Sequence, residues 1–526
     1  MRNKLNILFV ASEATPFAKE GGLGDVVGAL STTLWRMGHN VRVVIPRYSI
    51  IDKARLGLKQ LRRSLGVPMG IMGTLWRAVL EGRMPGSGVP IYFIEHEKFF
   101  ERNGSLYNEP SGNAYGDNDI RYIFLSRAAL ELCTMINFRP DVIHVHDWHT
   151  AVISVFLNTT AYKDDPLLGN SATLLTIHNM QHQGNFHKRL MEVLGIGWEH
   201  FNYSELEFYD RVNLLKGGIY HSTLINTVSP TYAKEIKTSE YGWGLDGVIR
   251  DRAKDFYGIL NGADYDEWNP ESDPYIAANY TEDDLSGKFI CKKDLQKTFE
   301  LPINGSVPII GMVCRLVYQK GIDVLADAIH RILSYNIQFV LLGSGESWAH
   351  LYFRDLAKRY PKKFACYIGY DNALSHKIKA GADFFFMPSR FEPCGLSQMY
   401  SMRYGTLPIV RATGGLNDTI EDFNERTLRG TGFKFNDLIT DTICNRIESA
   451  IYTYHTNKEA IKTLIRRAMQ KRFRWEDSAK RYEELYYLAI KKRMNDNRFR
   501  KDSKYIAVAN EFKMEIGYLC RNSIIG

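Results

Sequence analysis

The chain contains 526 residues, of which 45% are hydrophobic and 24% charged, a composition typical of a folded globular protein that excludes a disordered chain and a small disulfide-stapled module. At about 150 residues per domain, this length predicts roughly two to four domains. The net charge of +8 arises mainly from a basic tail at 491–504, so the rest of the chain is nearly balanced and we expect no nucleic-acid partner. We interpret the tail as a solvated terminus, with a docking patch for an acidic partner as the alternative.

The first residues, MRNKLNILFVASEA, combine a basic start with a short apolar run, as a signal peptide does. Asn6 and Glu13 interrupt the run and a glycine-rich turn follows it, so we interpret it as a buried strand. No stretch of the chain approaches the roughly 20 apolar residues that a membrane helix needs, and we expect no membrane association. The seven cysteines are odd in number, scattered and without a CxxC pair, which indicates a reducing, cytoplasmic location.

Short apolar runs rich in β-branched residues recur through the first half of the chain. They predict strands at 6–12, 41–45, 90–96, 141–146, 173–178 and 224–229. Their apolarity is continuous rather than alternating, which is typical of parallel strands covered by helices on both faces. Residues 24–37 supply the first crossover helix, which Gly38 ends.

The pattern restarts after a stretch rich in turn-forming residues at 257–275. A second series of strands is predicted at 307–316, 337–345, 364–370, 383–389, 407–412 and 432–435. We therefore predict an α/β fold with two tandem Rossmann-like, doubly wound domains. Ligands of such sheets bind beyond the carboxyl ends of the strands, so we expect a cleft between the two domains. The predicted domains are 1–255 and 256–474, followed by a C-terminal helix that returns to the first domain and the basic tail, 475–526.

The first predicted strand leads into KEGGLGD, which spans Lys19 to Asp25 and opens the first predicted helix. Glycines at such a turn let backbone N–H groups approach an anion at the positive end of the helix, and Lys19 adds charge. A phosphate site is therefore a candidate here. The segment matches neither the Walker pattern nor GxGxxG, and close packing of the helix is the alternative explanation for its glycines.

Histidines gather at the ends of two neighbouring strands. In HVHDWH (144–149), the strand period of two places both strand histidines on one face, and Asp147 follows the strand. Metal binding is the obvious hypothesis, but we expect none, because no second acidic cluster completes a hydrolytic metal site. His178 and Asn179 end the next strand and join Asp147 in a polar group suited to sugar hydroxyls. Structural hydrogen bonding is the alternative for each of them.

The second series of strands carries charged residues at its strand ends. CRLVYQKG sets Arg315 and Lys320 at the exit of one strand, where two cations suit a leaving diphosphate, with a surface ion-pair cluster as the alternative. FEPCGLSQMY places Glu392 in a loop that enters a helix, where it stabilises a developing positive charge or merely complements the helix dipole. Further candidate anion sites are the backbone near Gly395 and Leu396 and the glycine-rich exit RATGGLND (411–418).

Taken together, these motifs resemble those of the bacterial glycogen synthase and plant starch synthase family, retaining glucosyltransferases of the GT-B architecture. The resemblance runs from about residue 5 to about residue 490. A series of motifs in one consistent order is far more specific than a single short match. The motifs are KEGGLGDVVGAL, YGDNDIRYIFLSRAALE, HVHDWHT, TIHNMQHQG, NLLKGGIYHS, NTVSPTYA, LNGADYDEWNPESD, CRLVYQKG, LLGSGE, FEPCGLSQMY and RATGGLNDT.

The resemblance implies roles for residues in the first half of the chain. Lys19 corresponds to a residue that contacts the phosphate-sugar region of the donor. Gly21 and Gly22 offer backbone donors there, and Asp25 lies in the same loop. The residues implied to hold the transferred glucose, or to lie in its pocket, are His178, Asn179 and Asp147.

In the second half, Arg315 and Lys320 correspond to the pair that neutralises the departing diphosphate. Glu392 corresponds to the acidic residue near the reacting sugar, and Tyr370 to an aromatic residue that stacks on the nucleotide base. The other implied substrate contacts are Cys394, Gly395, Leu396, Thr413 and Gly414.

The implied reaction transfers glucose from ADP-glucose to a growing α-1,4-glucan, such as glycogen, with retention of configuration. Its route is front-face and oxocarbenium-like, and the leaving phosphate helps to deprotonate the acceptor. The resemblance implies no metal and no cofactor, since side-chain cations and backbone dipoles stabilise the diphosphate. The choice of ADP over UDP rests on the resemblance alone.

Two positions depart from the family pattern. Glu20 follows Lys19 where many members carry a small or uncharged residue, so its charge either weakens donor binding or faces solvent. Tyr400 stands eight positions after Glu392, where related retaining families carry a second glutamate, so a two-carboxylate scheme is not expected. The alternatives to the implied function are a GT-B sugar-nucleotide epimerase, a pyridoxal-phosphate-dependent glucan phosphorylase and a non-catalytic glucan-binding or priming homologue.

Overall fold

The computed structural model describes residues 4–495 and divides into two compact units, each of which we describe by itself. Unit 1 comprises the chain up to Asn226, Gly242–Tyr257 and the chain from Ala479 onward, and unit 2 comprises Thr227–Tyr241 and Gly258–Ser478. The segment Thr227–Tyr241, which the sequence analysis placed in the first domain, thus belongs to unit 2. The tail beyond residue 495 and Cys520 lie outside the described residues.

Unit 1 is built on a nine-stranded sheet with the order β14-β13-β9-β8-β1-β2-β7-β6-β3. Its six predicted strands are confirmed as β1 (Asn6–Val10), β2 (Asn40–Pro46), β7 (Pro90–Ile94), β8 (Val142–His146), β9 (Ala172–Ile177) and β13 (Leu224–Thr227). From β9 to β7 the pairs are parallel. The sequence analysis missed β14 (Phe256–Gly258) and the antiparallel edge formed by β6 (Val79–Arg83) and β3 (Lys59–Gln60).

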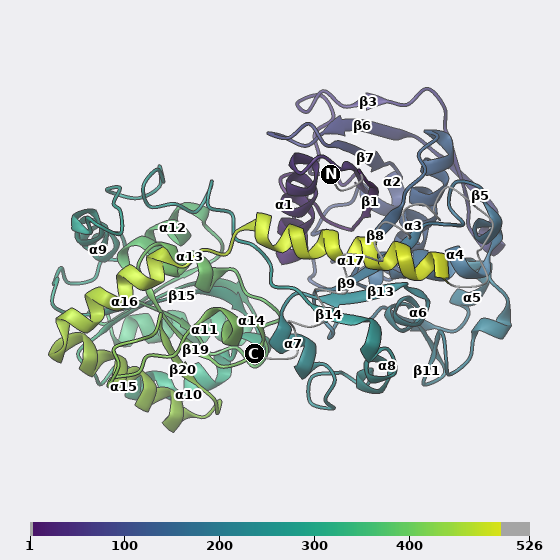
Figure 1. Ribbon diagram of the computed structural model, residues 1–526. Coiled ribbons are helices and arrows are strands. Elements are labelled where there is room, and N and C mark those ends of the chain that lie inside the picture. The colour runs from purple at the N-terminus through teal and green to yellow at the C-terminus, as the bar shows by residue number, and fades with distance from the viewer. Residues whose placement is uncertain (1–3, 496–526) are drawn as a thin grey trace. The chain divides into compact units, whose positions relative to one another are not determined.

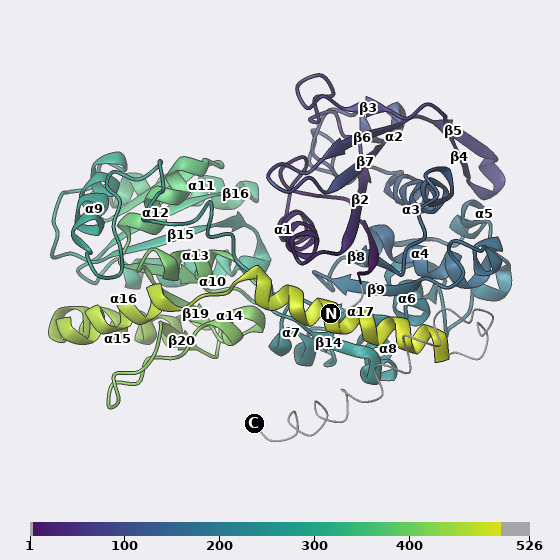
Figure 2. The ribbon, with the colours of Figure 1, turned by 45° about the horizontal axis from the view of Figure 1, so that its top comes forward.

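Helices cover both faces of this sheet, as the continuous apolarity of its strands predicts. Helix α1 (Gly22–Arg36) lies on one face and α3 (Asn118–Met135) on the other (Figure 2), and α3 packs beside α4 (Asp147–Thr159). The last helix, α17 (Trp475–Asn495), passes over β8 (Figure 1). Its Tyr486 hydroxyl lies 2.8 Å from Nδ1 of His144, and the Asn226 amide donates to Tyr482 Oη at 3.0 Å. From Ala479 onward, α17 therefore belongs to unit 1.

Unit 2 holds a six-stranded parallel sheet with the order β17-β16-β15-β18-β19-β20. The strands are β15 (Ile309–Leu316), β16 (Gln338–Gly345), β17 (Phe364–Ile368), β18 (Phe384–Met387), β19 (Leu407–Arg411) and β20 (Phe433–Phe435), so every strand predicted for the second series is confirmed. Right-handed crossovers place α10 (Ile322–Ile332) and α11 (Ser347–Arg359) on one face. They place α12 (Asn372–Gly381), α13 (Ser397–Arg403) and α14 (Gly414–Thr419) on the other.

The strand orders locate the functional ends of both sheets. In unit 2 the chain leaves the neighbouring strands β15 and β18 in opposite directions, and in unit 1 it does so at β1 and β8. Such topological switch points leave a crevice at the carboxyl ends of the strands, where open α/β sheets bind ligands. Within residues 4–495, no helix combines the length and apolar character that crossing a bilayer requires.

Candidate active site

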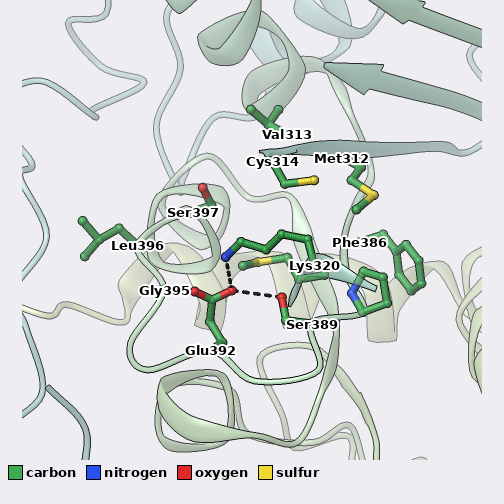
Figure 3. A pocket seen from close by; sticks show the side chains of 12 residues that line it. Met312, Val313, Cys314, Lys320, Phe386, Ser389, Glu392, Gly395, Leu396 and Ser397 are labelled. Atoms are coloured by element: carbon green, nitrogen blue, oxygen red, sulfur yellow. Dashed lines mark hydrogen bonds and ion pairs between the residues drawn. The ribbon is translucent and has the colours of Figure 1, made fainter. Parts of the chain in front are cut away.

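A pocket of about 150 Å³ lies at the switch point of unit 2, between the ends of β15 and β18 (Figure 3). Its polar wall consists of Lys320, Ser389 and Glu392, and its other residues are largely apolar. Lys320 ends the short η5 helix (Tyr318–Lys320) that follows β15, and Ser389 follows β18. Two sequence-distant loops therefore meet at the place where the sheet topology predicts a ligand.

An ion pair dominates the pocket. The Lys320 ammonium donates to Oε2 of Glu392 at 2.5 Å, and the Ser389 hydroxyl donates to the same oxygen at 2.9 Å. Glu392 is only 6% exposed, so the pair is poorly screened by water. The geometry fixes a cation and an anion side by side, and such a pair can act on substrate charge of either sign.

Glycines hold the loops of this pocket in place. Gly321 has φ of 68°, and a Cβ there would lie 2.1 Å from the carbonyl oxygen of Pro388. Gly395 has φ of 69°, also in the left-handed region that favours glycine. Gly415 donates its backbone N–H to the carbonyl of Glu392 at 3.0 Å. The backbone at Pro388, in the loop that leads to Glu392, therefore leaves no room for a side chain at Gly321.

The glycine-rich exit after β19 holds an anion of the protein itself. Gly414 N–H and the Thr413 hydroxyl each donate to Oε1 of Glu235 at 2.9 Å. Glu235 ends α7 (Pro230–Glu235), and burial raises the pKa of its carboxyl. The donors of this exit therefore hold the Glu235 carboxylate, which engages both Thr413 and Gly414. The sequence analysis missed Glu235 because it lies far from Thr413 along the chain.

The other candidate residues of unit 2 do not belong to the polar wall of the pocket. Arg315 is exposed, and its guanidinium donates to Gln319 Oε1 at 3.5 Å. Tyr370 is 75% exposed, and its hydroxyl donates to Asn372 Oδ1 at 3.0 Å. Gly395 and Leu396 line the pocket, whereas Cys394 is buried and is not among its lining residues.

In unit 1, the glycine-rich turn lies beyond β1 at the switch point. Lys19 forms an ion pair with Asp25 at 2.7 Å. Oε2 of the buried Glu13 accepts the backbone N–H groups of Glu20 at 2.7 Å and Gly21 at 3.0 Å. Burial raises the pKa of the Glu13 carboxyl, while the Tyr107 hydroxyl and these N–H groups oppose the shift. The N–H of Gly21, expected to face the donor, is therefore directed at Glu13.

Close packing, the alternative explanation, applies to a glycine of α1 that follows the turn. A Cβ on Gly28 would lie 2.6 Å from the carbonyl oxygen of Thr15. At Gly21 and Gly22, by contrast, a Cβ would meet no atom within 4 Å. Close packing therefore accounts for Gly28 but not for Gly21 or Gly22.

The histidine cluster lies at the other side of the same switch point. Nε2 of His178 lies 3.0 Å from Nδ1 of His146, and the backbone N–H of His178 donates to Asp147 Oδ1 at 2.7 Å. The N–H of Asn179 also reaches the Asp147 carboxyl. Burial lowers the pKa of His178 to about 3 and raises that of Asp147 to about 7. The predicted group of Asp147, His178 and Asn179 is therefore assembled, with a neutral imidazole at its centre.

Hydrogen bonds also account for the remaining strand histidine. Both ring nitrogens of His144 are engaged, one with Tyr486 and the other with Thr176 Oγ1 at 2.7 Å. Across the described residues there is no group of three or more His, Cys, Asp or Glu side chains arranged to hold a metal ion.

Known proteins match the chain over most of its length. Residues 6–251 match the starch synthase catalytic domain, and residues 294–481 match the glycosyl transferases group 1. Glycogen synthase 1 of Geobacter metallireducens is 60% identical over 496 residues, which cover 94% of this chain and 98% of that one. The glycogen synthase of Treponema denticola is 44% identical and covers 93% and 99% of the two chains. The chain belongs to the glycogen synthase and starch synthase family.

Solved structures agree with this assignment. The catalytic domain of starch synthase IV from Arabidopsis thaliana, bound to ADP and acarbose, matches with a TM-score of 0.85 and 36% identity over 93% of this chain and 100% of that one. The sucrose-phosphate synthase of Thermosynechococcus elongatus, 16% identical with a TM-score of 0.57, shares the fold. The family member described here is thus a glycosyltransferase with the two-domain GT-B fold, as predicted. The epimerase, phosphorylase and non-catalytic alternatives gain no support.

Glu20 stands where many members of the family carry a small or uncharged residue, and the structure shows what its carboxylate contacts. The Glu20 carboxylate accepts the backbone N–H of Leu106. The same loop is fixed by Tyr107, whose hydroxyl donates to Glu13 Oε1 at 2.5 Å, and by Arg121, which donates to the Leu106 carbonyl at 3.1 Å. The negative charge of Glu20 is therefore turned toward a backbone donor rather than toward the phosphate site.

We expect Glu20→Ala to loosen this loop, because it removes the acceptor of the Leu106 N–H. Hydrogen exchange at the Leu106 amide should quicken, and the free energy of unfolding should fall by about 1 kcal/mol. Glu20→Gln is the matched control, since its amide oxygen still accepts the bond while the charge is lost. Equal exchange rates in Glu20→Ala and the parent protein would contradict the assignment.

The buried histidines predict how stability changes with pH. Burial lowers the pKa of His144, His146, His149 and His178, so each stays neutral when folded but binds a proton on unfolding below about pH 6.5. Asp147, with its pKa raised to about 7, acts in the opposite sense, since it binds a proton on folding between about pH 4 and 7. Within this cluster four histidines outweigh one carboxyl, so the contribution of these five groups to stability should fall as the pH drops below 6.5.

Urea unfolding measured from pH 7 to pH 5 checks this expectation. Each group that binds a proton contributes about 1.4 kcal/mol per pH unit once its titration is complete. Asp147→Asn removes the opposing group while keeping an oxygen for the His178 N–H, so its free energy of unfolding should fall more steeply on acidification than that of the parent. An equal slope in the variant and the parent would show that Asp147 is charged in the folded protein.

Proposed function

We propose that the protein transfers glucose from ADP-glucose to the non-reducing end of an α-1,4-glucan such as glycogen, with retention of configuration. Relatives up to 60% identical along almost the whole chain are glycogen synthases, and a similar starch synthase structure holds ADP and acarbose. The observation that carries the proposal is the buried Lys320–Glu392 pair at the switch point of unit 2. The pair supplies a cation for a leaving diphosphate and an anion for a reacting sugar.

The proposed step breaks the bond between C1 of the glucose and the diphosphate oxygen, and the bonding electrons leave with the diphosphate. The O4 hydroxyl of the glucan forms the new bond to C1 on the same face, and its proton passes to the departing phosphate. Lys320 and the exposed Arg315 offset the charge that grows on the diphosphate. Glu392 stabilises the positive charge that develops on the sugar ring.

Unit 1 contributes groups that hold sugar and phosphate in this proposal. His178 is neutral at physiological pH because its pKa is near 3, so it acts as a hydrogen-bonding partner of sugar hydroxyls and not as a cation. Asn179 offers an amide beside it. Lys19, at the glycine-rich turn, contacts the phosphate-sugar region of the donor, and Tyr370 in unit 2 stacks on the base.

The test is incorporation of labelled glucose into glycogen, with ADP-glucose and UDP-glucose compared in parallel and a chelator present. We expect robust transfer from ADP-glucose that the chelator does not affect. Transfer from UDP-glucose alone would correct the donor. No transfer from either donor, with glycogen still bound, would replace the proposal by a non-catalytic glucan-binding role. A cytoplasmic site of action stays a prediction from the cysteine pattern.

A further inference from the structure

Two exposed aromatic residues of unit 1 hold a backbone conformation that favours glycine or asparagine. Tyr209 has φ of 52° and is 82% exposed, and Trp243 has φ of 51° and is 42% exposed. Bulky L residues rarely adopt this left-handed conformation, and strained positions of this kind concentrate at functional sites. Neither ring is buried, so packing of the core does not explain why aromatic residues stand at these positions.

The local structure at Tyr209 makes the choice of residue more unusual. Tyr209 and Asp210 form the tip of the hairpin between β11 (Glu207–Phe208) and β12 (Arg211–Asn213), and both have positive φ. Two-residue hairpin turns of this type strongly prefer Asn-Gly or Asp-Gly. A tyrosine at the first turn position is thus unfavourable for the hairpin itself.

Four aromatic residues lie at or next to this hairpin, and we call them the aromatic face: Tyr203, Phe208, Tyr209 and Trp243. The rings of Phe208 and Tyr209 lie 4.7 Å apart, and Gly244, next to Trp243, packs against Phe208. Tyr203, 78% exposed, lies 4.7 Å from the buried Lys216 ammonium, which is also 6.0 Å from the Phe208 ring. Figure 1 shows β11 beside α6 (Leu214–His221), which carries Lys216.

The aromatic face is continuous with the segment that carries the candidate sugar-binding residues. Gln183, five residues beyond His178, donates to the carbonyl oxygen of Trp243 at 3.0 Å. Its side-chain oxygen accepts the amide of Asn213, the last residue of β12, at 2.8 Å. The loop after β9 therefore links His178 to both the hairpin and Trp243 within unit 1.

We propose that the aromatic face binds the α-1,4-glucan chain of the acceptor, an inference that rests on the proposed function. Each glucose ring has an apolar C–H face that packs on an aromatic ring and a rim of hydroxyls that needs polar partners. The Lys188–Asp210 pair, 2.9 Å apart at the hairpin tip, supplies such partners. The core of a protein interface is instead depleted of charged residues, which makes a sugar chain the better occupant.

The test replaces both strained residues by asparagine, which tolerates positive φ and so keeps the hairpin folded. For Tyr209→Asn/Trp243→Asn we expect the Kd for glycogen, measured by co-sedimentation, to rise about tenfold. The ratio of the KM for glycogen to the KM for maltotriose should rise with it, and the melting temperature should not fall. Tyr452→Ala, which removes an exposed aromatic ring of unit 2, is the matched control and should leave all of these values unchanged.

The outcomes separate this inference from the proposed function. A double variant that binds glycogen like the parent protein, while both transfer glucose, would overturn the aromatic face alone. A parent protein that transfers no glucose to any glucan would overturn the proposed function, and a loss of glycogen binding in the variant would still support the face. A self-association that the double variant abolishes, without a change in glycogen binding, would show that a second copy of the chain is the occupant.

Discussion

Replacing Glu392 by alanine should reduce the turnover number on the order of 10²- to 10³-fold, the largest effect that we expect from any single substitution. Glu392 is buried and bonds to both Lys320 and Ser389, so it is held at one place in the pocket. A fixed carboxylate stabilises a developing positive charge without reorganising during the reaction. The measurement is steady-state transfer from ADP-glucose, with the melting temperature as a check on folding.

Glu392→Gln provides the control for this experiment. The amide keeps the size of the side chain and an oxygen that accepts from Ser389, but it carries no charge. Because truncation also strands the Lys320 ammonium in a poorly hydrated pocket, Glu392→Ala should be less stable than Glu392→Gln. If both variants lose turnover similarly, the charge is what matters. Turnover close to that of the parent in Glu392→Ala would remove Glu392 from the mechanism.

Replacing Lys320 by alanine should raise the activation free energy by about 2 to 4 kcal/mol, because the cation that offsets the leaving diphosphate is lost. The Lys320 side chain is 16% exposed and points into the pocket, so solvent weakens its charge little. The loss should appear mainly in kcat if the interaction strengthens as the diphosphate departs. The measurement is kcat and KM for ADP-glucose over a range of donor concentrations.

Lys358→Ala, an exposed lysine on α11, is the matched control for charge removal in the same unit and should leave kcat and KM unchanged. The double variant Lys320→Ala/Glu392→Ala measures the coupling of the pair. Because the two side chains touch, we expect its loss to be smaller than the sum of the single losses. Strict additivity would show that the two side chains act independently, and unchanged kinetics in Lys320→Ala would return Lys320 to the role of a structural ion-pair partner.

The sequence predicted the two sheets because parallel strands covered on both faces are continuously apolar, and this pattern is local. The same rule placed Lys320 and Glu392 at strand ends, and the structure brings them together across 72 positions of sequence. Resemblance to the family then attached roles to them. The antiparallel edge of unit 1 was missed because β3 has only two residues, both exposed, and β6 has two buried residues followed by half-buried and exposed ones, so it lacks a continuous apolar run.

The sequence analysis did not predict the hydrogen bonds of two carboxylates. Glu13 and Glu235 each accept backbone N–H groups of a glycine-rich turn, where the sequence analysis expected a substrate. A glycine-rich turn indicates that an anion fits, but it does not say which anion. The partner of the turn after β19 comes from a segment that the sequence analysis assigned to the other domain. Whether a substrate or a side chain occupies such a turn therefore depends on contacts between residues far apart in sequence, and no local motif reveals these contacts.

Each unit is built from separate segments of the chain, and this affects folding during translation. The helix that carries Glu235 leaves the ribosome before any strand of the sheet that it serves, because Thr227–Tyr241 precedes the main body of unit 2. Conversely, His144 and Asn226 of unit 1 receive their partners Tyr486 and Tyr482 only when α17 has been synthesised. Chains truncated before α17 would therefore leave two polar groups inside unit 1 without these bonds, however early the first sheet forms during translation.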